Sequence, residues 1–402
     1  MISIDNFNYV IWNNLLKPYD SLEHIFYPHG SLNLISSPYS KLERTEQKLI
    51  TGPRVFFYDQ EPLLENQSQQ IFQYHKLSED KKENRVKQAE ELGFKENFLN
   101  GNLKVNILAN SEHSELKTQL CQEFNMADWY YFYHGFASLY WFNDYRFLTQ
   151  TNNIDFTKVF ITFNRLVSAN RSYRLYFVSS LLDQGLDKHG HISLQLQDEI
   201  GTWEQEIFRR DSLLTPAAKK TIYKNLKLLE KPLIVDNDSV KGVASAQLDL
   251  NTNRLGFWNV VTETVYYQNK QHLTEKIFKP IVGRQPFILL GAYKNLDYLK
   301  SYGFKTFSSY IDESYDLEVD NVKRTDMVVA ELKKLCQLST AELKDMHNDM
   351  QDILAHNFHW FYHDFKHIIV DELVDNFKET VTNLNYNPGL VNWAEVKSLL
   401  KQ

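Results

Sequence analysis

Residues 273–291 read Leu-Thr-Glu-Lys-Ile-Phe-Lys-Pro-Ile-Val-Gly-Arg-Gln-Pro-Phe-Ile-Leu-Leu-Gly. This pattern predicts a short helix followed by a buried strand. Thr274 is suited to cap the helix, Glu275 matches the positive charge of a first turn, and three apolar residues recur at helical spacing. A glycine and a proline then predict the end of the helix, and the apolar run 287–290 predicts the strand.

The start of this predicted helix is a candidate binding site. The first turn of a helix presents backbone N–H groups without intrahelical partners, and Lys276 and Lys279 add positive charge beside them. Such a helix start is able to hold a phosphate-bearing ligand. The same pattern is also typical of an ordinary amphipathic helix with a solvated Glu-Lys face, and the residues alone leave both interpretations open.

Composition places the chain among globular proteins with more than one domain. Its 402 residues suggest two or three domains at roughly 150 residues each. Hydrophobic residues make up 43% and charged residues 24%, which is typical of a globular protein with a sizeable core. The net charge of −7 argues against a protein whose whole surface binds nucleic acid, although an acidic protein is able to carry a local basic groove.

No metal site, disulfide or membrane span is predicted. Cys121 and Cys336 are far apart and belong to no Cys-x-x-Cys motif. Four histidines between 356 and 367 lie three or four residues apart, but no carboxylate completes a ligand set, so we interpret them as packing residues. The start of the chain lacks the pattern of a signal peptide and no apolar run approaches roughly 18 residues, so we expect a cytoplasmic protein.

Two carboxylates follow an early predicted strand. Residues 54–58 read as that strand, and Asp59 and Glu61 come directly after it. Ligands of open α/β sheets collect beyond the carboxyl ends of strands, so either carboxylate is a candidate general base. The alternative is a polar turn closed by a proline.

His134 lies in the densest aromatic stretch of the chain, residues 129–142. Its imidazole follows a strand-like run and precedes a glycine, where a side chain with a near-neutral pKa is able to accept a proton from a hydroxyl. The alternative is a histidine that simply packs among aromatic rings.

Three arginines occupy the segment that follows the predicted strand 158–163. Arg165, Arg171 and Arg174 lie between this strand and an amphipathic helix. Guanidinium groups bind phosphate in a bidentate manner and a helix start adds N–H donors, which favours a diphosphate site. A solvated basic loop is the alternative, and the absence of a Gly-x-Gly-x-x-Gly motif argues against a dinucleotide enzyme.

Glu263 belongs to another predicted strand, residues 256–266, whose residues alternate between two faces. A carboxylate here, just before the helix at 274, is able to accept a hydrogen bond from a ribose or sugar hydroxyl. The alternative is an edge-strand carboxylate in water.

The order of these elements predicts an α/β chain with two Rossmann-like domains. We expect an N-terminal α/β domain over residues 1–155 and a second α/β domain over 156–340. The loosely patterned residues 151–155 serve as the candidate linker. Helices over 341–402 are expected to pack back across the domains.

Two segments resemble known glycosyltransferases. The run from Thr274 to Lys276, with its apolar helix and the following Gln-Pro-Phe-Ile-Leu, resembles the donor-nucleotide segment of family 10 fucosyltransferases and related two-domain (GT-B) enzymes. The Asn-Arg, spaced basic residues, helix and Asp-x-Gly over 164–185 resemble the opening of the donor domain in glycosyltransferase-like proteins of tailed phages. The resemblance implies two domains facing a central cleft, with Glu275 on the donor ribose and Lys276 on its phosphates.

The resulting hypothesis is inverting, metal-independent transfer of a sugar from a nucleotide-diphosphate sugar, which is a co-substrate and not a cofactor. Glu61, Asp59 or His134 deprotonates the acceptor hydroxyl. The cationic side chains of the donor site stabilise the leaving diphosphate. Donor binding is assigned to Arg165, Arg171, Arg174, Glu263, Thr274, Glu275 and Lys276.

The acceptor is left open between two classes. One is a glycan, and the other is 5-hydroxymethylcytosine in phage DNA, flipped out and stacked on aromatics such as Trp129, Tyr131 or Trp141. If the chain is phage-encoded, its compartment is the host cytoplasm. The alternative function is a non-catalytic saccharide- or nucleotide-binding protein that retains the fold.

Overall fold

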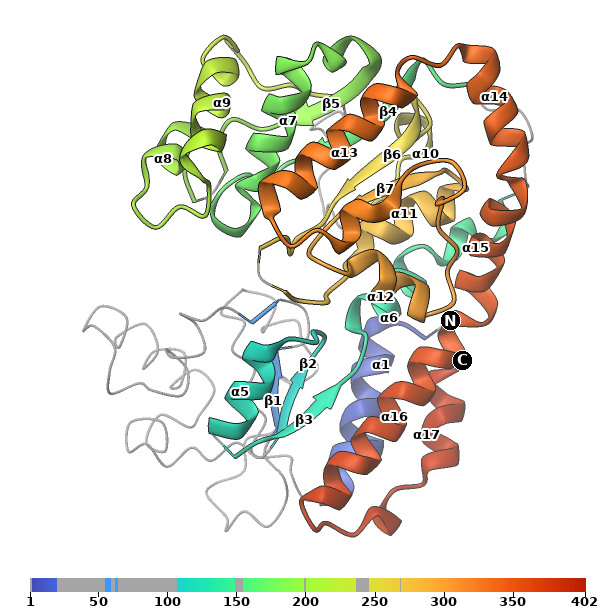
Figure 1. Ribbon diagram of the computed structural model, residues 1–402. Helices are drawn as coiled ribbons and strands as arrows, with labels where there is room; N and C mark the ends of the chain where they lie inside the picture. Colours follow the sequence, from blue (N-terminus) through green and yellow to red (C-terminus); the bar gives the residue numbers. More distant parts are fainter. Residues whose placement is uncertain are drawn as a thin grey trace. The chain divides into compact units, whose positions relative to one another are not determined.

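The computed structural model describes residues 2–19, 55–58, 62–63, 107–123, 125–148, 155–198, 200–235, 246–267 and 269–402. The chain divides into two compact units (Figure 1). Unit 1 contains residues 1–140 and 366–402, and unit 2 contains residues 141–365. Both units hold a parallel sheet and several helices, which confirms the prediction of an α/β chain.

Unit 1 is built on a three-stranded parallel sheet in the order β1-β2-β3. Its strands are β1 (Val55–Tyr58), β2 (Ile107–Asn110) and β3 (Ala127–Tyr130). Its helices are α1 (Ile4–Val10), which continues as η1 (Ile11–Leu16) and η2 (Lys17–Tyr19), then α5 (Glu115–Glu123), α6 (Tyr133–Trp141), α16 (Phe365–Asn383), η12 (Pro388–Leu390) and α17 (Trp393–Leu400). The last residues of the three strands lie level, so the segments that follow them meet at one edge of the sheet.

The C-terminal helix α16 covers the outer edge of β3. Asn376 Nδ2 donates to the carbonyl of Tyr130 at 2.9 Å, and Thr380 Oγ1 donates to the carbonyl of Asp128 at 2.7 Å. The indole of Trp129 in turn donates to a carbonyl of α16 at 3.2 Å. Alternate carbonyls on the open side of an edge strand need partners, and α16 supplies them (Figure 1).

Unit 2 is built on a four-stranded parallel sheet in the order β5-β4-β6-β7. Its strands are β4 (Lys158–Asn164), β5 (Gly190–Leu194), β6 (Gly256–Thr262) and β7 (Phe287–Leu290). Its helices are η7 (Asn143–Phe147), η8 (Ala169–Arg171), α7 (Tyr173–Asp183), η9 (Leu186–His189), α8 (Trp203–Phe208), α9 (Pro216–Leu226), α10 (Leu250–Asn253), α11 (Glu275–Gly283), α12 (Asn295–Ser301), η11 (Glu313–Leu317), α13 (Asn321–Leu335), α14 (Thr340–Asp349) and α15 (Gln351–His363).

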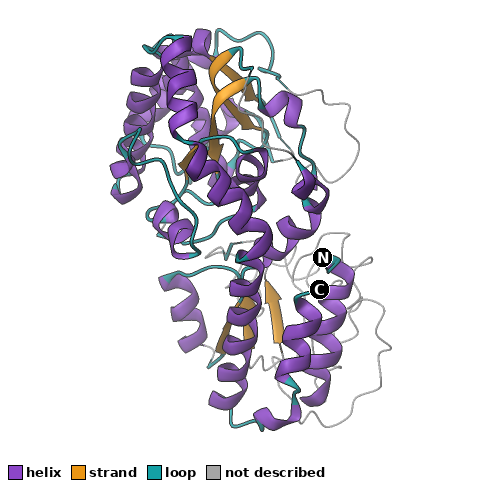
Figure 2. Ribbon diagram, turned by 90° about the vertical axis from the view of Figure 1, so that its right-hand side faces the viewer, coloured by secondary structure: helices purple, strands orange, loops and turns teal. Residues whose placement is uncertain are grey.

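The strand order of unit 2 reverses between β4 and β6. The chain runs from β4 outward to β5, then returns past β4 to β6 and continues to β7. Because crossovers between parallel strands are right-handed, the helices α7 and α11 cover opposite faces, and Figure 2 shows the strands lying among helices. The carboxyl ends of strands at such a reversal are where open α/β sheets bind ligands.

The central stretch folds as its sequence predicts. The helix α11 begins after Thr274, and the strand β7 follows at residues 287–290. The ring of Phe278 packs 5.2 to 5.9 Å from the rings of Phe304, Phe361 and Phe365, measured between centroids. This aromatic cluster fixes the buried face of α11 and therefore the direction of its N-terminus.

The strand β6 differs from its prediction in two respects. It ends at Thr262, and all seven of its residues are buried instead of alternating. The interpretation of Glu263 as an edge-strand carboxylate is wrong, because β6 lies between β4 and β7. A parallel strand covered by helices on both faces has no solvated side, so alternation is lost.

Candidate functional site

Glu263 ties the end of β6 to the start of α11. Its side chain has no exposed surface, and its two carboxylate oxygens accept from the backbone N–H of Thr274 at 3.1 Å and from Thr274 Oγ1 at 2.7 Å. The N–H of Thr264 donates to the same carboxylate at 3.0 Å. The structure therefore places Glu263 beneath the cap of α11, where its oxygens accept hydrogen bonds from the protein itself and no exposed surface is left for a ribose.

The Lys276 ammonium lies at the N-terminus of α11 among three oxygen atoms. Its Nζ is 3.1 Å from each of Thr264 Oγ1, Thr274 Oγ1 and Glu275 Oε1. Glu275 is 3% exposed, whereas the side chain of Lys276 is 31% exposed. Lys276 is consequently the most exposed of these three side chains, while Thr274 and Glu275 contact its ammonium group.

Arg174 links the basic loop to the end of β6. It lies in the first turn of α7, is 3% exposed, and donates from Nη1 to the carbonyl of Leu166 at 2.9 Å. Its Nη2 donates to the carbonyls of Thr262 at 2.8 Å and Glu263 at 3.1 Å. We expected Arg174 to bind the donor, but the structure buries its guanidinium on backbone carbonyls, so its role is to position the loop.

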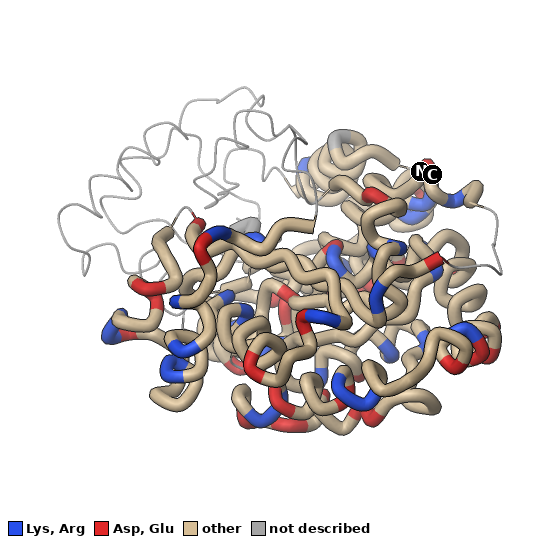
Figure 3. The backbone as a smooth tube through the Cα atoms, turned by 90° about the horizontal axis from the view of Figure 1, so that it is seen from above, with Lys and Arg blue, Asp and Glu red and all other residues tan. Residues whose placement is uncertain are grey.

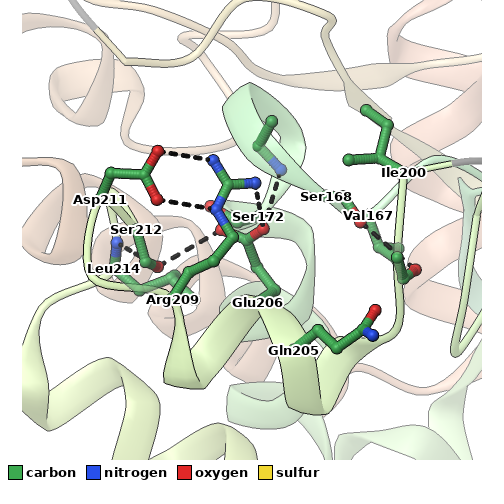
Figure 4. A network of polar contacts seen from close by, with 12 residues as sticks. Val167, Ser168, Ser172, Ile200, Gln205, Glu206, Arg209, Asp211, Ser212 and Leu214 are labelled. Carbon is green, nitrogen blue, oxygen red and sulfur yellow. Dashed lines mark hydrogen bonds and ion pairs between the residues drawn. The ribbon is translucent and has the colours of Figure 1, made fainter.

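Two buried or half-buried carboxylates hold the loop between β4 and α7. Both Val167 and Ser168 donate their backbone N–H to Asp198 Oδ2 at 2.8 Å, and Ala169 donates its N–H to Glu206 Oε2 at 3.1 Å. Three successive N–H groups at the carboxyl end of a strand form a potential anion-binding nest. In this structure the protein's own carboxylates occupy that nest (Figure 4).

The environments of these two carboxylates shift their acidities in opposite directions. Burial opposes ionisation of Asp198, but its hydrogen bonds from Val167, Ile200 and Ser168 outweigh burial and lower its pKa. Burial dominates for Glu206 and raises its pKa, against the hydrogen bond from Ala169 and the nearby charge of Arg209. No sequence pattern pointed to either residue, since both follow β5 and meet the loop only in the folded unit.

The remaining two arginines of the loop lie nearer the surface. Arg165 follows the last residue of β4 and is exposed, and Arg171, at the end of η8, is half-buried. Through Arg174, their loop is hydrogen-bonded to the carbonyls of Thr262 and Glu263, and the start of α11 is hydrogen-bonded to the side chain of Glu263. The two basic segments that the sequence singled out therefore meet at the end of β6, beside the reversal of strand order.

Hydroxyl groups that sequence reasoning missed surround this meeting point. Tyr173 donates its hydroxyl to the carbonyl of Glu263 at 2.6 Å, and the hydroxyls of Ser172 and Tyr267 lie 3.0 Å apart. Burial raises the pKa of Tyr267, so its phenol stays protonated and available as a hydrogen-bond donor. Ser172 and Tyr173 lie at the start of α7 and Tyr267 lies beyond the end of β6, so these contacts form only in the folded unit.

The candidate bases belong to unit 1. Asp59 and Glu61 lie outside the described residues, but Leu63 just after them donates its N–H to Glu112 Oε2 at 2.7 Å. His134 lies in the first turn of α6 and is 8% exposed, with its ring edge-on to Tyr133 at 5.7 Å between centroids. Burial limits the access of an acceptor to His134, which is a physical argument against its role as the base.

A second polar cluster that the sequence did not reveal lies at the same edge of the unit 1 sheet. Lys117 is 2% exposed, and its Nζ is 2.7 Å from Asp128 Oδ1 and 3.0 Å from the carbonyl of Glu112. The ring of His113 stacks on Tyr130 at 3.9 Å. Loss of water around the stacked imidazole and the charge of Lys117 lower the pKa of His113, so this ring is neutral at neutral pH.

Neither a metal centre nor a membrane span is found within the described ranges. No group of three or more His, Cys, Asp or Glu side chains there is arranged to hold a metal ion. His356 packs on Trp360 and lies 2.9 Å from the carbonyl of Gly303, as a packing residue would. No helix among the described residues is long and apolar enough to cross a bilayer.

Comparisons of the chain with protein-family models, curated proteins and solved structures found no match.

Proposed function

We propose that the chain is a nucleotide-sugar-dependent glycosyltransferase whose unit 2 binds the diphosphate of the donor. One observation carries this proposal. The loop that bears Arg165 and Arg171, through Arg174, and the helix start that bears Lys276, through Thr274, are both hydrogen-bonded to Glu263 at the reversal of strand order. Cationic groups and a helix N-terminus at this position match the charge and the usual location of a nucleotide diphosphate in an α/β sheet.

The proposed role of the cations is to stabilise charge that develops on the leaving diphosphate. Transfer of a sugar to a hydroxyl breaks the bond between the anomeric carbon and the diphosphate oxygen, and negative charge grows on that oxygen. Lys276, with Arg165 and Arg171, balances this charge. A base, for which Asp59 and Glu61 are the leading candidates, accepts the proton of the acceptor hydroxyl as it attacks the anomeric carbon.

A GT-B arrangement and an inverting outcome are parts of the same proposal. The acceptor is a glycan or the hydroxymethyl group of a modified cytosine in duplex DNA. Binding to hydroxymethylated duplex DNA that weakens steeply with salt favours the DNA acceptor, because phosphate contacts release counterions. Absence of such binding favours the glycan.

The second candidate is a non-catalytic protein that retains the fold. The observation that favours it is the occupation of the loop N–H groups of Val167, Ser168 and Ala169 by Asp198 and Glu206. A phosphate at this loop has to bind through arginine side chains alone, because these three backbone donors already have partners.

A panel of UDP-, GDP- and CMP-sugars tests the proposal. We expect at least one donor to raise the melting temperature of the full chain and to release nucleotide when an acceptor is added. Lys276→Ala and Arg171→Ala are expected to abolish the thermal shift, while Lys333→Ala, an exposed lysine of α13, leaves it unchanged. A thermal shift without nucleotide release supports the second candidate, and the absence of any shift overturns both.

A further inference from the structure

Exposed apolar side chains are concentrated in one part of unit 2. Of the twelve large hydrophobic side chains that are exposed in the described part of the chain, six lie between residues 200 and 234. Phe208 is 75% exposed, Leu228 is 72% exposed and Tyr223 is 49% exposed. Single exposed apolar residues need no explanation, but a concentration of them marks a surface that interacts with something.

The same segment is basic although the whole chain is acidic. Residues 200–234 carry seven Lys and Arg and four Asp and Glu, one of which, Glu206, is buried, in a chain with a net charge of −7. No acidic side chain in the described ranges forms an ion pair with Arg210, Lys220, Lys227 or Lys231. Figure 3 shows Lys and Arg lying among Asp and Glu over the described backbone.

Contacts between α8 and α9 bring these two helices together. Lys219 on α9 donates to the carbonyl of Arg209, which follows Phe208 at the end of α8, at 3.3 Å. One turn further along α9, Tyr223 lies 6.4 Å from the ring of Trp203 on α8, and Lys227 lies 5.1 Å from the ring of Tyr223.

The buried face of α9 is separate from this surface. The residues that pack inward are Ala218, Ile222 and Leu226, which recur every four positions. Lys220, Tyr223 and Lys227 recur at the complementary helical spacing and lie outward. The α8–α9 surface is thus defined by Phe208, Arg210, Lys220, Tyr223, Lys227 and Leu228.

We propose that the α8–α9 surface binds the anionic face of a lipid bilayer. Its basic side chains complement acidic headgroups, while Phe208, Tyr223 and Leu228 provide apolar groups that insert at the boundary between headgroups and acyl chains. The rest of the chain is acidic and is repelled by such a bilayer, so charge directs this one surface towards it. The protein lies on the membrane through this surface and does not span it.

The apolar component favours a bilayer over nucleic acid. A nucleic acid attracts lysines and arginines equally well and stacks on aromatic rings, but an exposed aliphatic side chain such as Leu228 gains nothing from a phosphate backbone. In a bilayer, the aliphatic and aromatic side chains both leave water.

Sedimentation of the full chain with vesicles tests the proposal. One vesicle contains phosphatidylcholine alone, and the other contains roughly 30% phosphatidylglycerol. We expect binding to the anionic vesicles only, with an affinity that decreases as salt is raised. Each lysine near the surface contributes roughly fivefold, so Lys220→Glu with Lys227→Glu is expected to weaken binding by roughly 25-fold or more.

Two variants separate charge from apolar insertion. Phe208→Ser with Leu228→Ser is expected to weaken binding while leaving its dependence on salt in place. The matched controls are Lys333→Glu and Val319→Ser, an exposed lysine and an exposed valine elsewhere in unit 2, and both are expected to bind as the parent chain does. Circular dichroism spectra establish that each variant is folded.

Four outcomes contradict the proposal. They are equal sedimentation with neutral and anionic vesicles, equal loss of binding in the control variants, binding of duplex DNA with no binding of vesicles, and self-association that the surface variants abolish without any vesicle binding.

Discussion

Asp316 is a buried carboxylate whose ionisation costs stability. It is 4% exposed, and it accepts from the N–H groups of Leu296 at 2.8 Å and Asp297 at 3.1 Å at the start of α12. Burial raises its pKa to about 6, against those two hydrogen bonds. The folded chain therefore holds a proton on Asp316 over a pH range in which the unfolded chain has released it.

The sign of the resulting pH dependence is fixed by this difference. The ordinary pKa of an aspartate is 3.8, and that of Asp316 in the folded chain is about 6. Between these two pH values the folded chain binds more protons than the unfolded chain, so the free energy of unfolding decreases as pH rises. We expect a contribution of about 3 kcal/mol over that interval. Asp316→Asn retains an acceptor and removes the titration, so the difference between the parent and variant unfolding curves measured across this range isolates the effect. A constant difference contradicts it.

Arg174 supports the loop through three backbone carbonyls, and its loss is expected to be costly. Arg174→Met retains much of the side-chain volume but leaves the carbonyls of Leu166, Thr262 and Glu263 without this donor. We expect the free energy of unfolding to fall by about 3 kcal/mol, measured by urea denaturation. Arg209→Met, which removes a half-exposed guanidinium paired with Asp211 and Glu206, is expected to cost about 1 kcal/mol or less. Equal losses in the free energy of unfolding for the two variants would show that the hydrogen bonds of Arg174 to the loop stabilise the chain no more than an exposed ion pair does.

Thr274 serves the helix α11 in two ways at once. Its hydroxyl accepts from Lys276 and donates to the buried Glu263. Thr274→Val is expected to lower the free energy of unfolding by about 2 kcal/mol or more, because it removes a cap and leaves a buried carboxylate without one donor. Thr215→Ala removes the cap of α9, in which the Thr215 hydroxyl accepts from the N–H of Ala218, and should cost about 1 kcal/mol. Chemical denaturation of Thr274→Val and Thr215→Ala measures the two losses in the free energy of unfolding, with Thr274→Ser as the conservative control. Equal losses for the two variants would contradict the double role of Thr274.

The elements that the sequence predicted well are those whose signals are local. Thr274, the helical spacing after it and Pro286 lie within a few residues of the structure they determine, and α11 and β7 form as expected. The burial of Arg174 was also predictable, because Arg174 lies at helical spacing from Val178 and Leu181, which are both fully buried. A basic residue on an apolar stripe indicates a buried support more than a ligand contact.

The parts of the site that sequence reasoning missed depend on contacts between distant residues. Glu206 meets Ala169 across 37 positions, and Arg174 meets Thr262 across 88. Nothing local marks such a carboxylate as the partner of a loop, because the partnership exists only after β4, β5 and β6 have paired. The sequence therefore indicated which segments are basic, but not which of their donors are paired with the protein's own carboxylates and carbonyls.

At the scale of the molecule, we expect the two units to unfold as separate cooperative transitions. Two buried threonines permit a matched test, because each donates to a backbone carbonyl within its own unit: Thr380 to Asp128 in unit 1 and Thr262 to Phe163 in unit 2. Replacing either with valine preserves its shape and is expected to cost about 1 kcal/mol. Calorimetry should show each variant lowering the melting temperature of one transition only. A single transition that both variants shift equally contradicts separate units.

Unit 1 takes its residues from the two ends of this sequence, whereas unit 2 is continuous. During synthesis on the ribosome, all of unit 2 emerges before the segment that α16 contributes to the edge of β3. Unit 2 is therefore able to acquire its structure while translation proceeds, but the early residues of unit 1 must wait for their late partner. A ribosome that stalls after residue 365 leaves a nascent polypeptide in which the carbonyl edge of β3 has no cover, and that edge is the place where we expect chaperones to engage it.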